Sequence, residues 1–355
     1  MTSITQTQPT LKLQGDNVGS LNLKSDSQPA AAAPLTINLD QHFGDWRDDL
    51  ARDGFVILKG VVPKERALGY RQSFFDWIEK WGMGFDQKDT STWVPEKIPV
   101  VRKGGMFHHS VGHEAFVWEV RQEQGILDAF TKLWGTDELL VSFDGANLSL
   151  PGDMQDPNQP AWWHVDQDPE KRGCVCVQGL VNLNYNGPKD GGLRVLKNSH
   201  KLNDEYFTKV WNSTDGFRLP KDIQESDFFG FTEPILEWFY ENGCEWIKPE
   251  MEPGDLVLWD SRTAHYNIPP LGEVDRCAVY TCYAPATTCI PEQLKIKQQL
   301  FKERKMTTHW PCTFLSPKTS VVLRDGEQCP YTHYEPFDEP EQTDKLLKLA
   351  GVKPY

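Results

Sequence analysis

The feature that most constrains the fold is a series of short β-rich runs between residue 139 and about residue 290. Gly, Pro, Asn and Asp separate these runs, and they are residues that interrupt strands and favour turns. Many short strands after an early helical layer predict a mainly β fold with flanking helices, in the form of a sandwich or jelly roll. The runs are 139–143, 174–184, 193–196, 255–259 and 276–283.

The first third of the chain has a different pattern. A helical stretch precedes an apolar strand signal at residues 55–58, and Pro63 then opens an amphipathic helix. Residues 123–134 predict another helix. Residues 84–117 show no sustained periodicity. We therefore expect this segment to form loops that cover a cleft.

These patterns predict one folded domain behind a tail. Residues 1–35 are rich in Thr, Gln, Ser and Ala, which predicts a disordered segment. We expect residues 36–355 to form a single domain, with a helical layer and lid at about 40–135, a β core at about 139–290 and a C-terminal extension at 291–355.

Composition excludes several classes of partner. The formal net charge of -14 disfavours nucleic acid and anionic lipid. No stretch approaches the roughly 20 apolar residues of a membrane span, and a signal peptide pattern is missing. The eight cysteines are diluted over a long chain, so free thiols are expected. The sequence predicts a cytoplasmic protein that binds no nucleic acid and no membrane, and a homo-oligomer stays open.

The first candidate site is the segment Trp163-His164-Val165-Asp166. On an extended strand, residues i and i+2 point to the same face, so His164 and Asp166 can bind one ion. Asp168 is a rival carboxylate, but on an extended chain it lies about 13 Å from His164, four residues away. Alone, such a pair is a common coincidence, and an exposed strand end explains it as well.

A second motif offers a third ligand. Pro253-Gly254-Asp255 forms a turn that leads into an apolar strand, and His265 follows at the end of that strand or just beyond it. Two imidazoles and one carboxylate on one face of an octahedral ion suit Fe(II) and leave three positions open. Structural zinc normally takes a fourth ligand, and none has a suitable spacing. The predicted metal ligands are therefore His164, Asp166 and His265.

Arg276 follows His265 across a turn built from Ile268-Pro269-Pro270-Leu271-Gly272. If these residues flank a hairpin, Arg276 lies on the strand next to the metal ligand. A guanidinium binds a carboxylate through two hydrogen bonds and stays charged when it is buried. Beside a metal site, Arg276 therefore predicts a co-substrate that carries a carboxylate. A surface ion pair is the alternative for an isolated arginine.

Together, these motifs resemble the phytanoyl-CoA dioxygenase family of Fe(II)/2-oxoglutarate oxygenases over about residues 40–290. Several motifs in the same order are far more specific than any one of them. The segments that carry the resemblance are Asp53-Gly54-Phe55-Val56-Ile57-Leu58-Lys59-Gly60, Leu150-Pro151-Gly152 before Trp163-His164-Val165-Asp166, Gly191-Gly192-Leu193-Arg194-Val195-Leu196-Lys197-Asn198-Ser199-His200, Pro253-Gly254-Asp255, His265 and Arg276.

The resemblance implies a double-stranded β-helix, which is a cupin-like jelly roll, with Fe(II), 2-oxoglutarate and O2 as cofactor and co-substrates. It implies that Arg276 binds the far carboxylate of 2-oxoglutarate and that Asn267 helps, where the family often has a small hydroxyl residue. Asp166 argues against the related halogenases, which have a small residue at that position. Leu150 stands where phytanoyl-CoA enzymes often have a basic residue, which argues against an acyl-CoA substrate.

Further residues near the motifs are candidates for substrate contacts. Trp163 and Trp259 flank the metal motifs, so one of them is expected to wall the pocket. Tyr280 shares a strand face with Arg276 by period two, with core packing as the equal alternative. Arg102 is a candidate for binding a substrate carboxylate. His108 is a candidate because polar groups in lid-like loops often bind ligands.

The favoured function is oxidation of an unactivated C–H bond in a small molecule, an amino acid or an intermediate of secondary metabolism, with succinate and CO2 as products. Hydroxylation is the default outcome, and desaturation or cyclisation stays open. A non-catalytic jelly-roll binding protein is one alternative, but the complete ligand set opposes it. A hydroxylase of a protein or acyl-CoA substrate is another, and a protein substrate would need an open groove where residues 84–117 predict a cover.

Overall fold

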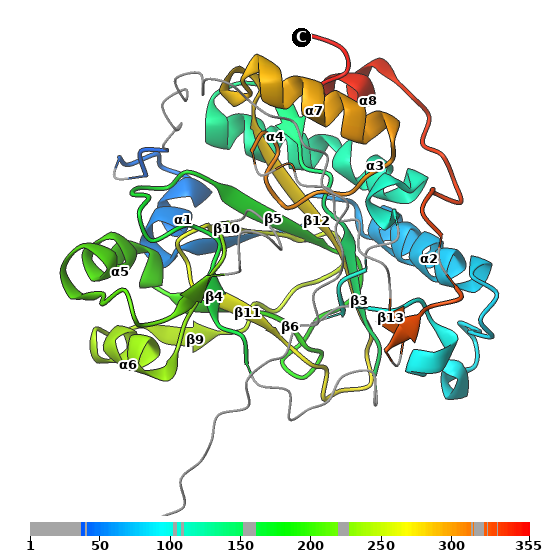
Figure 1. Ribbon diagram of the computed structural model, residues 1–355, viewed down its shortest axis with the longest axis horizontal. Coiled ribbons are helices and arrows are strands. Elements are labelled where there is room, and N and C mark those ends of the chain that lie inside the picture. Colours follow the sequence, from blue (N-terminus) through cyan, green and yellow to red (C-terminus); the bar gives the residue numbers. More distant parts are fainter. Residues whose placement is uncertain are drawn as a thin grey trace, which may run out of the picture.

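Two facing β-sheets with helices on their outer sides make up the fold of the computed structural model (Figure 1). The structure describes residues 37–39, 41–101, 105–107, 110–151, 161–218, 227–313, 315, 323–324, 326–331 and 333–355. Among these residues, no helix is both long and apolar enough to cross a membrane.

The larger sheet has the strand order β1-β10-β5-β12-β2, and β3 also pairs with β12. Figure 1 shows α2, α3, α4, α7 and α8 on the side of this sheet that faces away from the smaller one. The bounds of these strands are β1 (Phe55–Leu58), β2 (Leu139–Val141), β3 (Ala146–Ser149), β5 (Val177–Asn182), β10 (Leu256–Asp260) and β12 (Arg276–Pro285). The helices of this half are α1 (Trp46–Asp53), α2 (Lys64–Lys80), α3 (Ala115–Arg121), α4 (Gln124–Trp134), α7 (Pro291–Lys302) and α8 (Asp344–Leu349).

The smaller sheet has the order β7-β8-β4-β11-β6-β9, and α5 and α6 pack on its outer side (Figure 1). Its pairs are antiparallel throughout, as in the larger sheet. The bounds are β4 (His164–Val165), β6 (Gly192–Lys197), β7 (Phe217–Arg218), β8 (Phe229–Gly230), β9 (Glu245–Ile247), β11 (His265–Ile268), α5 (Ser199–Glu205) and α6 (Glu233–Glu241). A separate hairpin joins β13 (Leu323–Arg324) and β14 (Glu327–Gln328).

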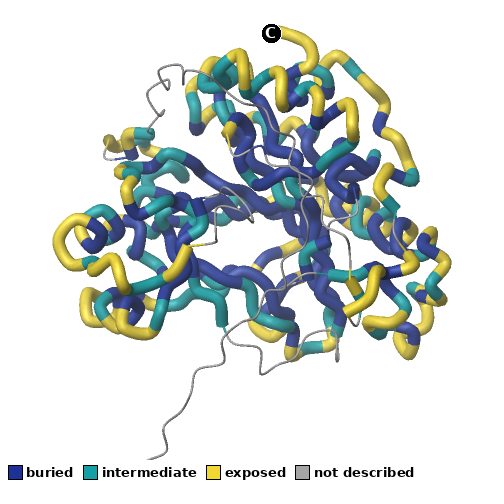
Figure 2. The backbone as a smooth tube through the Cα atoms, in the orientation of Figure 1, coloured by how far each residue is buried: buried dark blue, intermediate teal, exposed yellow. Residues whose placement is uncertain are grey.

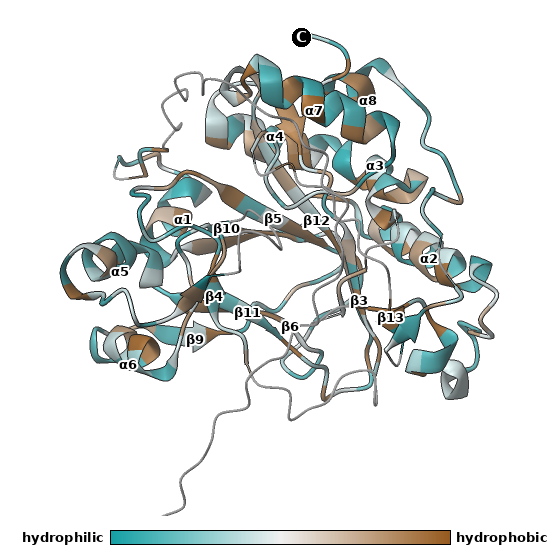
Figure 3. Ribbon diagram, viewed as in Figure 1, coloured by the Kyte–Doolittle hydropathy of each residue, from teal (hydrophilic) through white to brown (hydrophobic). Residues whose placement is uncertain are grey.

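Alternation along the strands divides the interior into layers. On β12, Cys277 and Val279 pack towards the helices, whereas Ala278 faces the smaller sheet. The central strands β5, β10 and β12 are largely buried, as the dark blue tube in Figure 2 shows, and β12 is mostly hydrophobic in Figure 3. Leu180 and Leu193, one from each sheet, belong to the apolar cluster between the sheets. This layer forms the floor on which the candidate site lies.

Gly54 lies where three of the sequence motifs pack against one another, namely its own segment, the segment that ends at His200 and the segment before His265. It ends α1 in a left-handed conformation with φ 83°, and a Cβ at this position would collide with His200 and Thr263. The hydroxyl of Thr263 donates to the Gly54 carbonyl at 2.9 Å, and His200 Nε2 lies 3.0 Å from the carbonyl of Ala51. His200 is thus a buried packing residue. The segment Asp53-Gly54-Phe55 contacts Thr263 and so supports the backbone just before His265.

The structure confirms the predicted fold class and the helices and strands expected from periodicity, with shifts of a few residues at their ends. One expectation was wrong. β11 and β12 do not form a hairpin, because β11 pairs with β4 and β6 whereas β12 pairs with β2, β3 and β5. The proline-rich connection after Ile268 crosses from one sheet to the other. Arg276 therefore lies opposite the strand of His265, not beside it.

Candidate active site

The three predicted metal ligands meet at the inner face of the smaller sheet. His164 begins β4 and His265 begins β11, and the two are direct register partners. Asp166 Oδ2 lies 3.3 Å from His265 Nε2 and 3.8 Å from His164 Nε2. One potential ligand atom from each residue lies within 4.8 Å of the other two. Three donors at such spacing fit a single metal ion on one face.

The hydrogen bonds of the two imidazoles orient the nitrogens that could bind a metal ion. His164 Nδ1 lies 2.9 Å from the carbonyl of Trp162, and His265 Nδ1 lies 2.9 Å from that of Thr263. Because a carbonyl only accepts, each Nδ1 carries the hydrogen and each Nε2 presents a lone pair. Burial lowers the pKa of His164 to about 3, so this ring is neutral near pH 7. Both nitrogens that face Asp166 are therefore available to a cation.

Asp166 is held as a carboxylate by its surroundings. Burial alone would raise the pKa of Asp166, but the neighbouring rings of His309, His164 and His265, when they are protonated, outweigh burial and hold this pKa well below its usual value. Gln178 Nε2, from β5 of the opposite sheet, donates to Asp166 Oδ2 at 2.9 Å. The backbone N–H of Asp166 donates to the Ser261 carbonyl at 3.1 Å. This carboxylate is thus held by β5 of the larger sheet and by the turn that follows β10.

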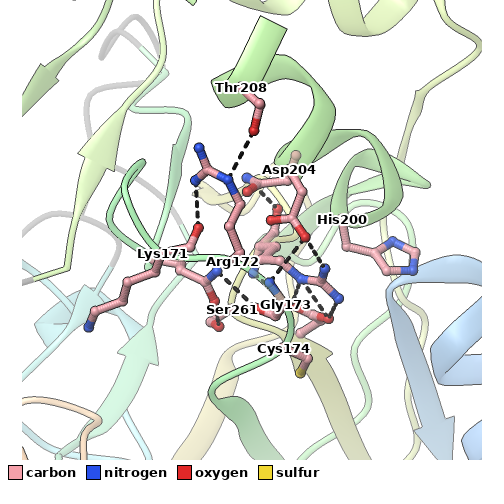
Figure 4. Close-up of polar contacts among 12 residues, drawn as sticks. Lys171, Arg172, Gly173, Cys174, His200, Asp204, Thr208 and Ser261 are labelled. Atoms are coloured by element: carbon pink, nitrogen blue, oxygen red, sulfur yellow. Dashed lines mark hydrogen bonds and ion pairs between the residues drawn. The ribbon is translucent and has the colours of Figure 1, made fainter. Parts of the chain in front are cut away.

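A polar network fixes the loop that follows Asp166. Gln167 accepts from the Ser261 hydroxyl at 2.9 Å and donates to the Gly173 carbonyl at 2.9 Å. Figure 4 shows how this loop joins the helical segment beyond β6, where the Gly173 N–H donates to Asp204 at 3.0 Å and Arg172 donates to Thr208 at 3.0 Å. The loop thus has little freedom to move the carboxylate.

Arg276 is a buried cation in need of an anion. Its side chain is completely buried, and none of its three guanidinium nitrogens has a hydrogen-bond partner among the described residues. An unpaired buried charge is costly, so a bound anion is the natural partner. Gly192, on β6 opposite, packs against this guanidinium with φ 97°. The guanidinium's donors suit a carboxylate.

Other predicted residues lie between the two sheets. Asn267 follows His265 by two residues on β11, and its Nδ2 lies 3.5 Å from the Tyr280 hydroxyl. Tyr280 also accepts from Asn147 at 3.3 Å. The ring of Trp259 lies 5.5 Å from that of His265, in the apolar layer between the sheets. The positions of all three are compatible with the predicted roles, which stay predictions.

One predicted substrate residue was wrong, and two lie outside the described residues. Trp163 packs on the outer side of the smaller sheet, in contact with Tyr266 at 6.4 Å between ring centroids. The reason is alternation: because His164 points inwards, its neighbour must point outwards. Arg102 and His108 are outside the described residues.

The structure also places residues at the site that the sequence did not reveal. Trp162 stacks on His164 at 4.5 Å with an interplanar angle of 9°, and Phe228 stacks on it at 4.9 Å. Gln178 donates a hydrogen bond to Asp166 Oδ2, and His309 Nδ1 lies 4.0 Å from the same oxygen. Gln178 was visible as a polar residue within an apolar strand. His309 gave no signal, because it lies far beyond every motif.

Comparison with known proteins agrees with this geometry. A profile of the phytanoyl-CoA dioxygenase family matches residues 50–268. The chain is 40% identical to Ava biosynthesis cluster protein O of Aspergillus versicolor, over 82% of this chain and 95% of that one. Among solved structures, it resembles the Salmonella typhimurium LT2 protein named "Putative Oxidoreductase", with a TM-score of 0.55 and 15% identity over 87% of this chain and 83% of that one.

A hypothetical protein from Escherichia coli is similar at a TM-score of 0.50, with 15% identity over 78% of this chain and 77% of that one. These two structures support the jelly-roll fold. The family match covers well over half of the chain, and the relative from Aspergillus aligns over most of both sequences. The chain belongs to the phytanoyl-CoA dioxygenase family and is an Fe(II)/2-oxoglutarate-dependent dioxygenase.

Proposed function

We propose that His164, Asp166 and His265 bind the Fe(II) and that Arg276, helped by Asn267, binds the far carboxylate of 2-oxoglutarate. The observation that carries this proposal is the completely buried Arg276, whose guanidinium has no partner among the described residues. A dicarboxylic co-substrate would supply the missing anion. The triad alone fits several metal chemistries, whereas the triad with Arg276 favours this one.

The chain's own side chains orient and enclose the reaction. Bound iron and 2-oxoglutarate supply the oxidation of a C–H bond by O2, with succinate and CO2 as co-products. The Trp162 and Thr263 carbonyls hold the imidazoles so that each Nε2 faces Asp166. Gln178 holds the carboxylate at 2.9 Å. Trp259 and its apolar neighbours exclude water from the layer beneath the site.

The proposed substrate is a small molecule of secondary metabolism, and hydroxylation is the proposed outcome. Support comes from the relative at 40% identity, which is named for a biosynthesis cluster. The enclosed position of the triad between two sheets also suits a small molecule, because His164 and His265 are both buried. This substrate class rests on the resemblance to that relative over 82% of the chain, and hydroxylation is proposed as the default outcome of the oxidation.

The test is anaerobic addition of Fe(II) and 2-oxoglutarate to the purified protein. We expect the weak visible charge-transfer band of the iron chelate, and succinate formation once O2 is admitted. His164→Ala should lose the band. Arg276→Gln should keep metal binding but weaken 2-oxoglutarate binding by a factor of about 100, as expected for the loss of a two-fold ionic hydrogen bond.

His42→Ala is the matched control, because His42 is 86% exposed in its side chain and lies outside the site. It should behave as the unaltered protein. If the protein forms no band and His164→Ala changes nothing in metal binding, the proposed metal site is wrong.

A further inference from the structure

The chain returns to the metal site long after its last barrel strand. Beyond α7, the segment Met306–Cys312 runs through the interior, and of its residues only His309 keeps appreciable exposure. The Thr307 N–H donates to the Phe143 carbonyl at 2.9 Å, and the Gly112 N–H donates to the sulfur of Met306 at 3.4 Å. A segment fixed at these points holds its side chains in defined positions.

His309 is the residue that this segment brings to the site. Its Nδ1 lies 4.0 Å from Asp166 Oδ2, the same oxygen that faces both ligand imidazoles. Its side chain is 17% exposed, so the ring is largely enclosed. The next residue, Trp310, is buried and packs with Cys176 and Cys282. The ring of His309 therefore borders the site and does not extend into solvent.

His309 stands apart from the tight group of three ligands. His164, Asp166 and His265 have donor atoms that all lie within 4.8 Å of one another, and His309 does not belong to this group. It therefore flanks the ligand set on the side of Asp166. An imidazole in that position would face an oxygen-bearing molecule that a bound metal would hold next to this carboxylate.

We propose that His309 is a positioning residue of the active site, which donates a hydrogen bond to the oxygen ligand that the metal holds beside Asp166. That ligand would be a water molecule or a carboxylate oxygen of 2-oxoglutarate. The proposal rests on the proposed function of the triad. It gives the C-terminal extension a role in the reaction, although residue 309 lies outside the span 50–268 that matches the family.

The experiment compares variants of residue 309 that either lack a hydrogen-bond donor or place it at a different position. His309→Leu keeps bulk without a donor, His309→Asn places a nitrogen near the position of Nδ1, and His309→Gln places one near Nε2. We measure Co(II) affinity from its visible absorption, and 2-oxoglutarate affinity from the anaerobic Fe(II) band. His42→Asn is the control, because this histidine is exposed and remote.

We expect His309→Leu and His309→Gln to weaken 2-oxoglutarate binding about tenfold, the loss typical of one hydrogen bond to a charged group, and His309→Asn to restore most of it. A loss confined to the 2-oxoglutarate titration identifies its carboxylate as the partner. A loss also seen with Co(II) alone identifies the water ligand. Either result supports the proposal.

The proposal is overturned if all three variants bind Co(II) and 2-oxoglutarate as the unaltered protein does. It is also overturned if Asn and Leu are equally impaired, because the ring would then only fill space. Thermal unfolding shows whether each variant is folded. If His309→Leu does not fold, the comparison of His309→Asn with His309→Gln still tests the proposal. Failure of the triad itself looks different, because the unaltered protein would then form no band.

Discussion

Gly192 packs directly against the guanidinium of Arg276 from the opposite sheet, and no Cβ fits between them. The two residues are 84 positions apart in the sequence, on β6 and β12. The glycine also adopts φ 97°, which an L side chain rarely takes. The guanidinium of Arg276 can therefore occupy this position only because residue 192 has no side chain.

Gly192→Ala should therefore displace Arg276 without touching the metal ligands. We expect the KM for 2-oxoglutarate to rise at least about tenfold, because the guanidinium loses its alignment with the carboxylate. Co(II) affinity should stay unchanged, and this measurement is the internal control. An unchanged KM would show that Arg276 does not depend on this glycine.

Gln178→Leu should weaken metal binding. The side-chain amide of Gln178 donates to Asp166 Oδ2 at 2.9 Å, and loss of such a partner typically reduces metal affinity 10–100-fold. Co(II) titration measures the change. Gln122→Leu is the control, since Gln122 donates to the Trp118 carbonyl within the helical layer. Equal Co(II) affinity in both variants would contradict the role of Gln178.

Gly54 and Gly60 offer a matched pair in one motif. Both have positive φ, but a Cβ at Gly54 collides with His200 and Thr263, whereas a Cβ at Gly60 meets nothing within 4 Å. Gly60→Ala should lower the free energy of unfolding by about 1 kcal/mol, from backbone strain alone. Gly54→Ala should cost roughly 2–4 kcal/mol because overpacking adds to the strain. Urea denaturation compares the two, and equal losses would refute the difference.

Glu114 provides a pH-dependent test of stability. It accepts hydrogen bonds from Trp77 Nε1 and from the N–H groups of Phe337 and Asp338, but burial prevails and raises its pKa to about 7. Its folded pKa exceeds its unfolded value of 4.5, so the folded state binds more protons between these values and loses stability as pH rises from 4.5 to 7.

Glu114→Gln removes this titration. The difference in free energy of unfolding between variant and unaltered protein should shift in favour of the variant by up to about 3 kcal/mol between pH 4.5 and pH 7. Chemical denaturation at several pH values measures it. A difference that stays constant over this range would mean that Glu114 does not titrate there.

The sequence predicted the parts of the site that lie within one strand or one motif. The i and i+2 spacing of His164 and Asp166 and the strand before His265 are local patterns, and the structure brings the three side chains together. The same alternation should have excluded Trp163, which must point away from its neighbour His164. That error came from an incomplete use of the pattern.

The hairpin error had a different cause. Turn-forming residues after Ile268 show that the chain reverses, but they do not show which sheet receives the next strand. In a two-sheet fold the chain changes sheets at such turns, and Arg276 reaches the site across the interior. Gln178 and His309 were missed for a related reason. Their contacts with Asp166 arise from strand packing and from a returning segment, and no local pattern predicts these contacts.

The brevity of β4 has a consequence for the apo protein. β4 is only His164–Val165, and it joins β11 through the pair His164 and His265 while holding β8 on its other side. A metal bound by both histidines would act as a cross-link across the loop of about 100 residues between them. Removing the metal should therefore speed amide hydrogen exchange in β4 and β8, while the larger sheet keeps its protection. Metal binding would thus be measurable as increased protection of this part of the smaller sheet.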